Sequence, residues 1–400
     1  MKICYLNYEG MPTIRFAGRD RSIGGLNTIV YNLIQSISEL PNVEASFVCR
    51  KSSEEIFAEG LAREQIITIK SGPNRVLNKD EQLLHLVDYG LKVKKLFDHN
   101  QPDIVHTSGS EAGAVMSMLR NQGLNTPWVH TNYATIGVRK VLVEKADFLS
   151  LVDTSEVVKR ELNCLLDCDH IISLSEIDAQ EIAKIFRIAK KKISYIYPGI
   201  DRQIFYPNRS IVRDDLIISA GRLSPIKDYA FLLTTFRLLL DLCKEGLKPK
   251  LLVVGGNNKE REELGLEQLA DKLKIAKQLI FSDALSQIEL AECFRQAKVF
   301  IGHSQHETFG LLPAEARACG LPTIVRNNSS YKINIPAKFI SPNHSEADMA
   351  IKIKEILCAS PEKWFSLSRE SIDSVAVYNW TKAAREHYSV YERVIKRKLQ

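Results

Sequence analysis

Short β-branched runs along this chain alternate with longer segments whose apolar residues recur at helical spacing. The runs at 299–301 (VFI) and 323–325 (TIV) are typical of buried strands. Residues 26–40 (LNTIVYNLIQSISEL) instead carry apolar side chains at the spacing of an amphipathic helix. Because strands and helices alternate over most of the chain, the pattern predicts an α/β protein whose sheets are covered by helices.

The alternation is interrupted near residue 200. The segment 193–207 (ISYIYPGIDRQIFYP) loses its periodicity and contains a Pro-Gly turn, which suits a hinge between domains. A second series of strand, loop and helix begins at 216–231 (LIISAGRLSPIKDYAF). We therefore place a domain boundary near residue 200, with a first domain over 1–200 and a second that starts at 201.

The stretch 303–322 (HSQHETFGLLPAEARACGLP) lies between two predicted strands, so it should form a loop followed by a helix. Gly310 lets a ligand approach the backbone, Pro313 suits the first helical turn, and Gly320 ends the helix. The backbone amides near Phe309–Leu312 can then receive an anion such as a diphosphate.

Two carboxylates flank this anion site, Glu307 before the helix and Glu315 within it. Even an unbroken helix, at about 1.5 Å per residue, would separate them by roughly 12 Å. A retaining glycosidase pair needs about 5 Å, so we do not interpret them as a hydrolytic dyad. They are better explained as two groups that hold different parts of one long ligand.

Other polar residues fall at the ends of predicted strands. His106 and His130 end two strands of the first domain, where ligands collect in open parallel sheets, although a lone histidine is often structural. Arg222 and Lys227 follow the first strand of the second domain. An arginine can bind phosphate oxygens through two hydrogen bonds and a lysine adds a point charge, so the pair suits a diphosphate.

A glycine pair, Gly24 and Gly25, stands where the first loop meets the first helix, and suits either a tight turn or a close approach to phosphate or sugar. The loop before it is long and basic and contains Arg15 and Arg19. We expect this loop to form part of an acceptor site or a lid.

Glu307, Phe309, Gly310 and Glu315 together resemble the signature of family 4 glycosyltransferases, retaining enzymes that use nucleotide sugars. The resemblance covers nearly the whole chain. It implies the GT-B fold, in which two Rossmann-like doubly wound domains face each other across a cleft. The first domain, 1–200, would hold the acceptor and the second, 201–379, the nucleotide sugar. A C-terminal helix over 380–400 would pack back on the first domain.

The resemblance also implies roles for individual residues. Glu315 would hold the ribose hydroxyls, Glu307 the donor sugar, and Arg222 and Lys227 the diphosphate as it leaves, while His130 would contact the sugar near the reacting carbon. The catalytic set is His130, Glu307, Arg222 and Lys227, and His106, Arg15 and Arg19 are acceptor-side candidates. The donor-binding set is Gly24, Gly25, Arg222, Lys227, Glu307, Phe309, Gly310, Leu311, Leu312 and Glu315.

The resemblance weakens after Val325. Relatives continue with a glycine pair and an acid, whereas this chain reads RNNSSYKINIPAKFISPN at 326–343. The shape of the sugar pocket, and therefore the sugar that it accepts, does not follow from the resemblance.

The composition limits the classes of ligand and partner that the protein is expected to bind. A net charge of +6 over 400 residues fits anionic ligands but is too small to indicate nucleic acid, and no nucleic-acid-binding signature is present. No run of about 18 apolar residues occurs, so no membrane span is expected. The eight cysteines are scattered, as in a reduced cytoplasmic protein, and neither Cys164 and Cys168 nor the His303 and His306 pair has the spacing of a convincing metal site.

We therefore expect a retaining glycosyltransferase of glycolipid, polysaccharide or other glycoconjugate synthesis. A UDP-sugar is the favoured co-substrate, and no other cofactor or metal is required. The basic stretches near Lys94, at 190–192 and at 396–398 suit peripheral contact with an anionic membrane, or are solvated faces. Two alternatives stay open, namely a nucleotide-sugar epimerase of the same fold and a catalytically silent binding protein.

Overall fold

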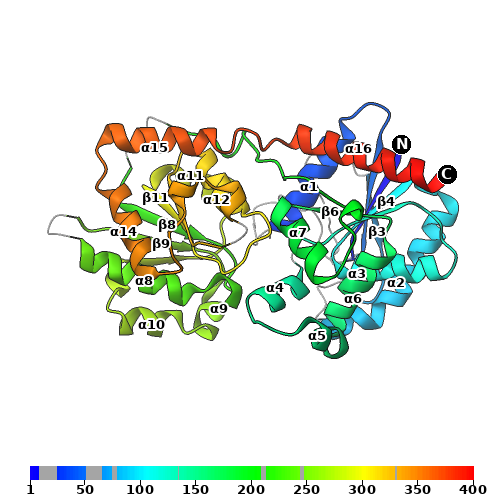
Figure 1. Cartoon of the computed structure of the whole chain (residues 1–400), viewed down its shortest axis with the longest axis horizontal. Helices are drawn as coiled ribbons and strands as arrows, with labels where there is room; N and C mark the ends of the chain where they lie inside the picture. Colours follow the sequence, from blue (N-terminus) through cyan, green and yellow to red (C-terminus); the bar gives the residue numbers. More distant parts are fainter. Residues whose placement is uncertain are drawn as a thin grey trace. The chain divides into compact units, whose positions relative to one another are not determined.

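The computed structural model describes residues 1–8, 25–50, 65–73, 79–133, 135–208, 213–243, 247–328 and 331–400. These form two compact α/β units (Figure 1). The first unit holds the described residues up to Gly199 together with Trp380–Gln400, and the second runs from Ile200 to Asn379.

The first unit is built on a parallel sheet of seven strands in the order β3-β2-β1-β4-β5-β6-β7. Buried strand residues such as Val105 and Ile171 pack with α2, α3 and α6 into one apolar core. Helices α1 and α16 pack against each other on the other side of the sheet (Figure 1). Its elements are β1 (Lys2–Leu6), α1 (Gly25–Ser38), β2 (Glu44–Arg50), β3 (Ile66–Ile69), α2 (Lys79–His99), β4 (Ile104–Ser108), α3 (Ser110–Asn121), β5 (Trp128–Thr131), α4 (Ile136–Leu142), α5 (Phe148–Thr154), α6 (Glu156–Asp167), β6 (His170–Ser173), α7 (Glu176–Ile185), the 3₁₀ turn η2 (Lys190–Lys192), β7 (Ile193–Tyr195) and α16 (Trp380–Leu399).

The second unit contains a parallel sheet of five strands in the order β10-β9-β8-β11-β12. Helices α8 and α14 cover one face, and α11, α12 and α15 lie together on the other (Figure 1). Its elements are β8 (Leu216–Ala220), η3 (Pro225–Lys227), α8 (Tyr229–Leu242), β9 (Lys250–Val254), α9 (Asn258–Glu263), α10 (Leu266–Lys272), η4 (Ala276–Gln278), β10 (Leu279–Ser282), α11 (Gln287–Gln296), β11 (Val299–Gly302), α12 (Leu311–Ala318), β12 (Thr323–Val325), α13 (Tyr331–Asn334), η5 (Ala337–Phe339), α14 (Glu346–Leu357) and α15 (Pro361–Asp373).

Both sheets confirm the doubly wound α/β architecture predicted from the sequence. In each, the strand order reverses beside the first strand of the unit, between β1 and β4 and between β8 and β11. Serine side chains cap two helices of these units. The Ser175 side chain accepts a hydrogen bond from the Asp178 amide at the start of α7, and Ser286 forms a capping box with Glu289 at the start of α11.

The C-terminal helix α16 returns to the first unit, as predicted. Its buried residues recur at three- to four-residue spacing, so one stripe faces the unit and the rest is polar. On that stripe the Tyr391 hydroxyl lies 2.7 Å from the Tyr5 hydroxyl of β1 and 2.7 Å from Nδ1 of His106 on β4. The His387 ring stacks on His106 with 5.8 Å between ring centres. The helix is therefore fastened to the sheet by a buried polar cluster as well as by apolar packing.

Replacing Tyr391 with phenylalanine tests this fastening. The variant Tyr391→Phe keeps the ring but leaves the buried Tyr5 hydroxyl and His106 Nδ1 without their shared partner. We expect the free energy of unfolding to fall by about 1–3 kcal/mol, measured by denaturant titration. The half-buried Tyr388 on the same helix supplies the control, because Tyr388→Phe should change stability far less. Equal stability of the two variants would show that the cluster does not hold the helix.

Candidate active site

Two loops of the second unit begin at neighbouring strand ends. Strands β8 and β11 pair directly, and the strand order reverses between them. Ligands of open parallel sheets bind beyond the carboxyl ends of the strands at such a point. The loop after β8 carries Arg222 and Lys227, and the loop after β11 carries Glu307. The fold therefore brings Lys227 and Glu307 together, although they are 80 positions apart in the sequence.

The loop after β8 holds its two cations differently. Arg222 lies two residues after the end of β8 and is exposed. Lys227 ends the turn η3, just before Asp228, which has a left-handed conformation (φ 55°) and accepts a hydrogen bond from the Phe231 amide to cap α8. The lysine is thus fixed by a capped helix, whereas the arginine side chain faces solvent.

Lys227 and Glu307 form an ion pair between the two loops. Both side chains are largely buried, with 17% and 19% of their surfaces exposed, and the Ser304 hydroxyl donates a second hydrogen bond to Glu307 at 2.7 Å. Burial alone would raise the pKa of Glu307, but Lys227 and Ser304 outweigh it and hold this pKa below its usual value. Glu307 is therefore a charged hydrogen-bond acceptor over the physiological pH range.

The start of α12 lies directly after this pair. Gly310 adopts a left-handed conformation (φ 85°) at the N-cap, and a Cβ there would come within 2.9 Å of the Tyr331 ring. Glycine is therefore required both by the backbone and by space. Phe309 is buried against Tyr378, while Leu311 and Leu312 begin the helix and are partly exposed. The helix begins within the predicted segment, and its first amides are those expected to bind an anion.

Glu315 lies one turn into α12 and differs sharply from Glu307. Only 7% of it is exposed, and burial together with the nearby Asp201 raises its pKa to about 8. In the ligand-free protein at neutral pH this carboxyl is therefore protonated, and it becomes an acceptor only when hydrogen-bond donors stabilise its charge. Such a group suits a pair of ligand hydroxyls.

In the first unit, His130 lies at the end of β5 and is fully buried. Its Nδ1 is 2.7 Å from the Thr107 hydroxyl, which already accepts a hydrogen bond from the Trp128 indole at 2.7 Å. Because an indole can only donate, the hydroxyl proton of Thr107 is free to point to Nδ1, and in that arrangement the imidazole proton is on Nε2. Burial lowers the pKa of His130 to about 3, so the ring is neutral. Among the residues that the structure describes, Nε2 has no hydrogen-bond partner.

Of the three acceptor-side candidates, the structure describes only His106. His106 lies inside β4 and hydrogen-bonds through both ring nitrogens, to Tyr391 and at 2.8 Å to Thr131, so it has a clear structural role. Its acceptor-side role stays a prediction. Arg15, Arg19 and Gly24 lie outside the described residues, and Gly25 is the first residue of α1.

The segment after Val325 contributes residues that the sequence did not reveal. Arg326 forms an ion pair with Asp228 at 2.6 Å, and Asn328 donates a hydrogen bond to the Ser304 carbonyl at 3.0 Å. Tyr331 lies buried beside Gly310. In the sequence, this segment was marked only by its departure from the pattern of relatives. No residue type or spacing in it predicted these contacts.

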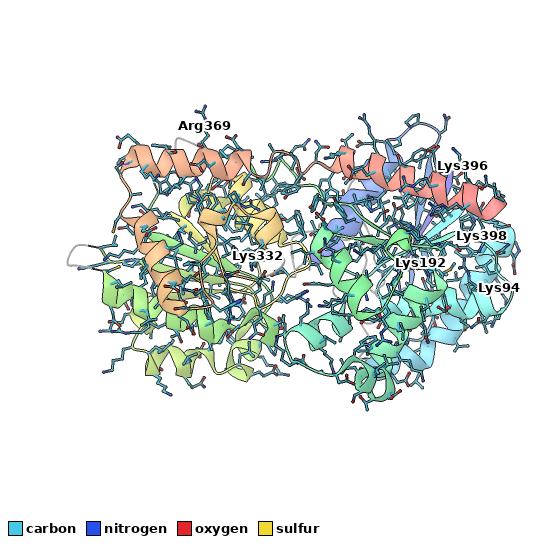
Figure 2. All side chains as sticks on the ribbon, viewed as in Figure 1. Lys94, Lys192, Lys332, Arg369, Lys396 and Lys398 are labelled. Atoms are coloured by element: carbon cyan, nitrogen blue, oxygen red, sulfur yellow. The ribbon has the colours of Figure 1, made fainter. Side chains whose placement is uncertain are left out.

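The described part of the chain contains no group of three or more His, Cys, Asp or Glu side chains that could hold a metal ion, and no helix long and apolar enough to cross a membrane. Of the basic residues labelled in Figure 2, Lys94 pairs with Asp98 and Lys398 with Asp169, while Lys192 donates to the Leu166 carbonyl. Membrane contact stays a prediction.

Comparison with known proteins identifies the family of the chain. Residues 23–204 match the family described as Glycosyltransferase Family 4, and residues 202–364 match Glycosyl transferases group 1. The chain belongs to the family 4, group 1 glycosyltransferases. This glycosyltransferase is 25% identical over 393 residues to D-inositol 3-phosphate glycosyltransferase of Streptomyces avermitilis. The aligned region covers 92% of this chain and 82% of that protein.

Solved structures identify the fold as GT-B. Sucrose-phosphate synthase of Thermosynechococcus elongatus superimposes with a TM-score of 0.81 at 20% identity, over 99% of both chains. Anabaena HepE, solved in complex with UDP-glucose, gives a TM-score of 0.74 at 14% identity, over 98% of this chain and 100% of that one. The glycosyltransferase described here thus has the GT-B fold.

The unusual state of Glu315 gives a prediction. Its folded pKa lies above its unfolded value of 4.5, so the folded protein keeps this proton longer and loses stability as pH rises from about 4.5 to 8. Glu315→Gln cannot ionise. Its free energy of unfolding should exceed that of the wild type at pH 9, by on the order of 2–5 kcal/mol, and match it near pH 4.5.

Denaturant titrations at both pH values measure this difference. The control is Glu289→Gln, because Glu289 has a lowered pKa in its capping box, and its loss should destabilise the protein at pH 9. If Glu315→Gln is less stable than the wild type at pH 9, the carboxyl is charged and satisfied in the free enzyme.

Proposed function

We propose that this glycosyltransferase transfers a sugar from a UDP-sugar to an acceptor hydroxyl with retention of anomeric configuration. The observation that carries the proposal is the Lys227–Glu307 ion pair at the paired ends of β8 and β11, immediately before the first amides of α12. A cation, a charged acceptor and a row of backbone donors are then close enough to contact one small ligand. A diphosphate joined to a sugar offers the matching anionic and hydroxyl groups.

Each residue has a role that fits its environment. Lys227 and the exposed Arg222 would neutralise the diphosphate as it leaves, while the α12 amides would bind its oxygens. Glu307, held charged, would accept hydrogen bonds from the sugar. Glu315 would accept from the ribose hydroxyls, which supply the donors that its burial requires.

His130 fits a role on the sugar because of its tautomer. The Nε2 proton has no acceptor among the described residues, so a sugar hydroxyl or a leaving oxygen would provide one. No side chain is proposed as a covalent nucleophile, and no metal is required, because Lys227 and Arg222 supply the positive charge.

The acceptor is proposed from the relatives. D-inositol 3-phosphate glycosyltransferase and sucrose-phosphate synthase bear the names of phosphorylated small molecules. A phosphorylated polyol or sugar is therefore our first candidate acceptor, and a lipid or polysaccharide acceptor in glycoconjugate synthesis is the second. An epimerase of the same fold would make product without an acceptor, and a silent relative would bind nucleotide without turnover.

A donor screen tests the reaction. Purified protein would be incubated with UDP-, GDP- and ADP-sugars while the release of nucleoside diphosphate is followed. We expect slow hydrolysis of a UDP-sugar, unchanged by EDTA and lowered about 10²–10³-fold in Glu307→Gln and in Lys227→Ala. Circular dichroism of each variant excludes loss of fold. If no sugar nucleotide is bound or turned over, the proposal fails.

Stereochemistry and acceptor are tested with the donor so identified. Nucleoside diphosphate release should accelerate with D-inositol 3-phosphate or a hexose phosphate and not with the same compounds lacking phosphate. NMR of the first-formed product should show the anomeric configuration of the donor. An inverted anomer would contradict retention, and a new nucleotide sugar formed without acceptor would favour the epimerase.

A further inference from the structure

We propose that Tyr331 is a positioning residue that orients Glu307 toward the donor sugar, and that Asn328 sets Tyr331 in place. The inference rests on the proposed role of Glu307 as the group that binds the sugar. It assigns a function to the segment after Val325, the one part of the second unit that the resemblance to family 4 left unexplained.

The Tyr331 ring fills the space between the end of β11 and the start of α12. The residue is 1% exposed. A Cβ placed on Gly310 would lie 2.9 Å from its ring, and one placed on Gly302 would lie 3.3 Å from its hydroxyl. Gly302 of β11 and Gly310 at the start of α12 thus leave room for this one side chain, so the ring can move little without displacing backbone.

The Tyr331 hydroxyl hydrogen-bonds with Glu307, and Ser304 lies beside both groups. An ionised carboxylate can only accept, so the phenol donates to it. Glu307 therefore receives Lys227 from η3, Ser304 from its own loop and Tyr331 from α13. Donors from three segments fix both the position and the rotation of the carboxylate, and its remaining lone pairs are left for a ligand.

Asn328 holds Tyr331 against this loop. Its side-chain oxygen accepts from the Tyr331 amide at 3.0 Å, while its side-chain nitrogen donates to the Ser304 carbonyl at 3.0 Å. Asn328 is itself buried, with 7% exposed. One amide side chain therefore joins the start of α13 to the loop that carries Glu307.

Arg326 fixes the other end of the segment to the loop after β8. Its guanidinium pairs with Asp228 at 2.6 Å and stacks over Phe231, 4.1 Å from the ring centre. Gln305 donates to the same Asp228 carboxylate at 3.1 Å. The segment is thus attached to both loops that supply the candidate donor-binding residues. From this segment the Tyr331 hydroxyl reaches the Glu307 carboxylate.

A purely structural tyrosine would not need this arrangement. Burial and the charge of Glu307 raise the pKa of Tyr331 well above its usual value, so the phenol stays protonated and always donates. Phenylalanine would fill the same space without placing a hydroxyl next to a buried charge. The hydroxyl is therefore explained by its effect on Glu307 rather than by packing.

The test is Tyr331→Phe, which removes only the hydroxyl. Dissociation constants would be measured by calorimetry for UDP-glucose, UDP-galactose, GDP-mannose and ADP-glucose, and for UDP, GDP and ADP alone. For the nucleotide sugar that the wild type binds best, we expect Tyr331→Phe to lose about tenfold in affinity and to bind the matching diphosphate unchanged. A general loss of fold would weaken both ligands.

The matched control is Tyr229→Phe. Tyr229 is equally buried in the second unit, but its hydroxyl donates to the Gly221 carbonyl at 3.0 Å. It should lose comparable thermal stability and keep the wild-type ratio of the two dissociation constants. Asn328→Ala, which frees the Tyr331 amide, should change the ratio in the same direction as Tyr331→Phe.

The outcomes separate the two proposals. If the wild type binds a nucleotide sugar and Tyr331→Phe leaves the ratio unchanged, the positioning role is wrong while the proposed function stands. An equal change in Tyr229→Phe would also overturn it. If the wild type binds none of the nucleotide sugars, the role of Glu307 fails and this inference fails with it.

Discussion

The ion pair between Lys227 and Glu307 is the constraint on which the candidate site depends. It joins the loops that follow two neighbouring strands. Residues on both loops fix the positions of the lysine and the glutamate. Asp228 caps α8 beside the lysine, Ser304 hydrogen-bonds to the glutamate, and Gly310, three residues after Glu307, is the N-cap of α12. Because the two charges are paired and Glu307 also accepts a hydrogen bond from Ser304, burying them leaves no uncompensated ion, and the site is organised before any ligand arrives.

The two glutamates of the site show how environment divides one kind of side chain into two states. Glu307 faces a cation and stays charged, whereas Glu315 is buried near another acid and holds its proton. The first is an acceptor at all times, and the second becomes one when hydroxyl groups surround it. A nucleotide sugar presents hydroxyls at both of its ends, so two differently prepared carboxylates can bind it without repelling each other strongly in the free protein.

Much of this site followed from local sequence. The strands, the caps at Ser175 and Ser286, and the glycine before α12 depend on residues within a few positions of one another, so periodicity and turn chemistry predict them. The contacts that complete the site do not. Lys227 and Glu307 are 80 positions apart, and His106 is 285 positions from Tyr391. Sequence placed each residue at a strand end, but only the strand order decides which ends become neighbours. Tyr331 was missed because no pattern marked it.

The return of α16 to the first unit has a consequence for how the chain is made. Tyr5 and Tyr391 share a hydrogen bond across 386 positions, and the second unit lies between them in the sequence. During synthesis, the first sheet therefore leaves the ribosome long before the helix that covers it. Until residues 380–400 emerge, the surface that receives Tyr391 stays open to water or to a chaperone. The second unit needs no such late segment, so it can reach its native state before the first unit does.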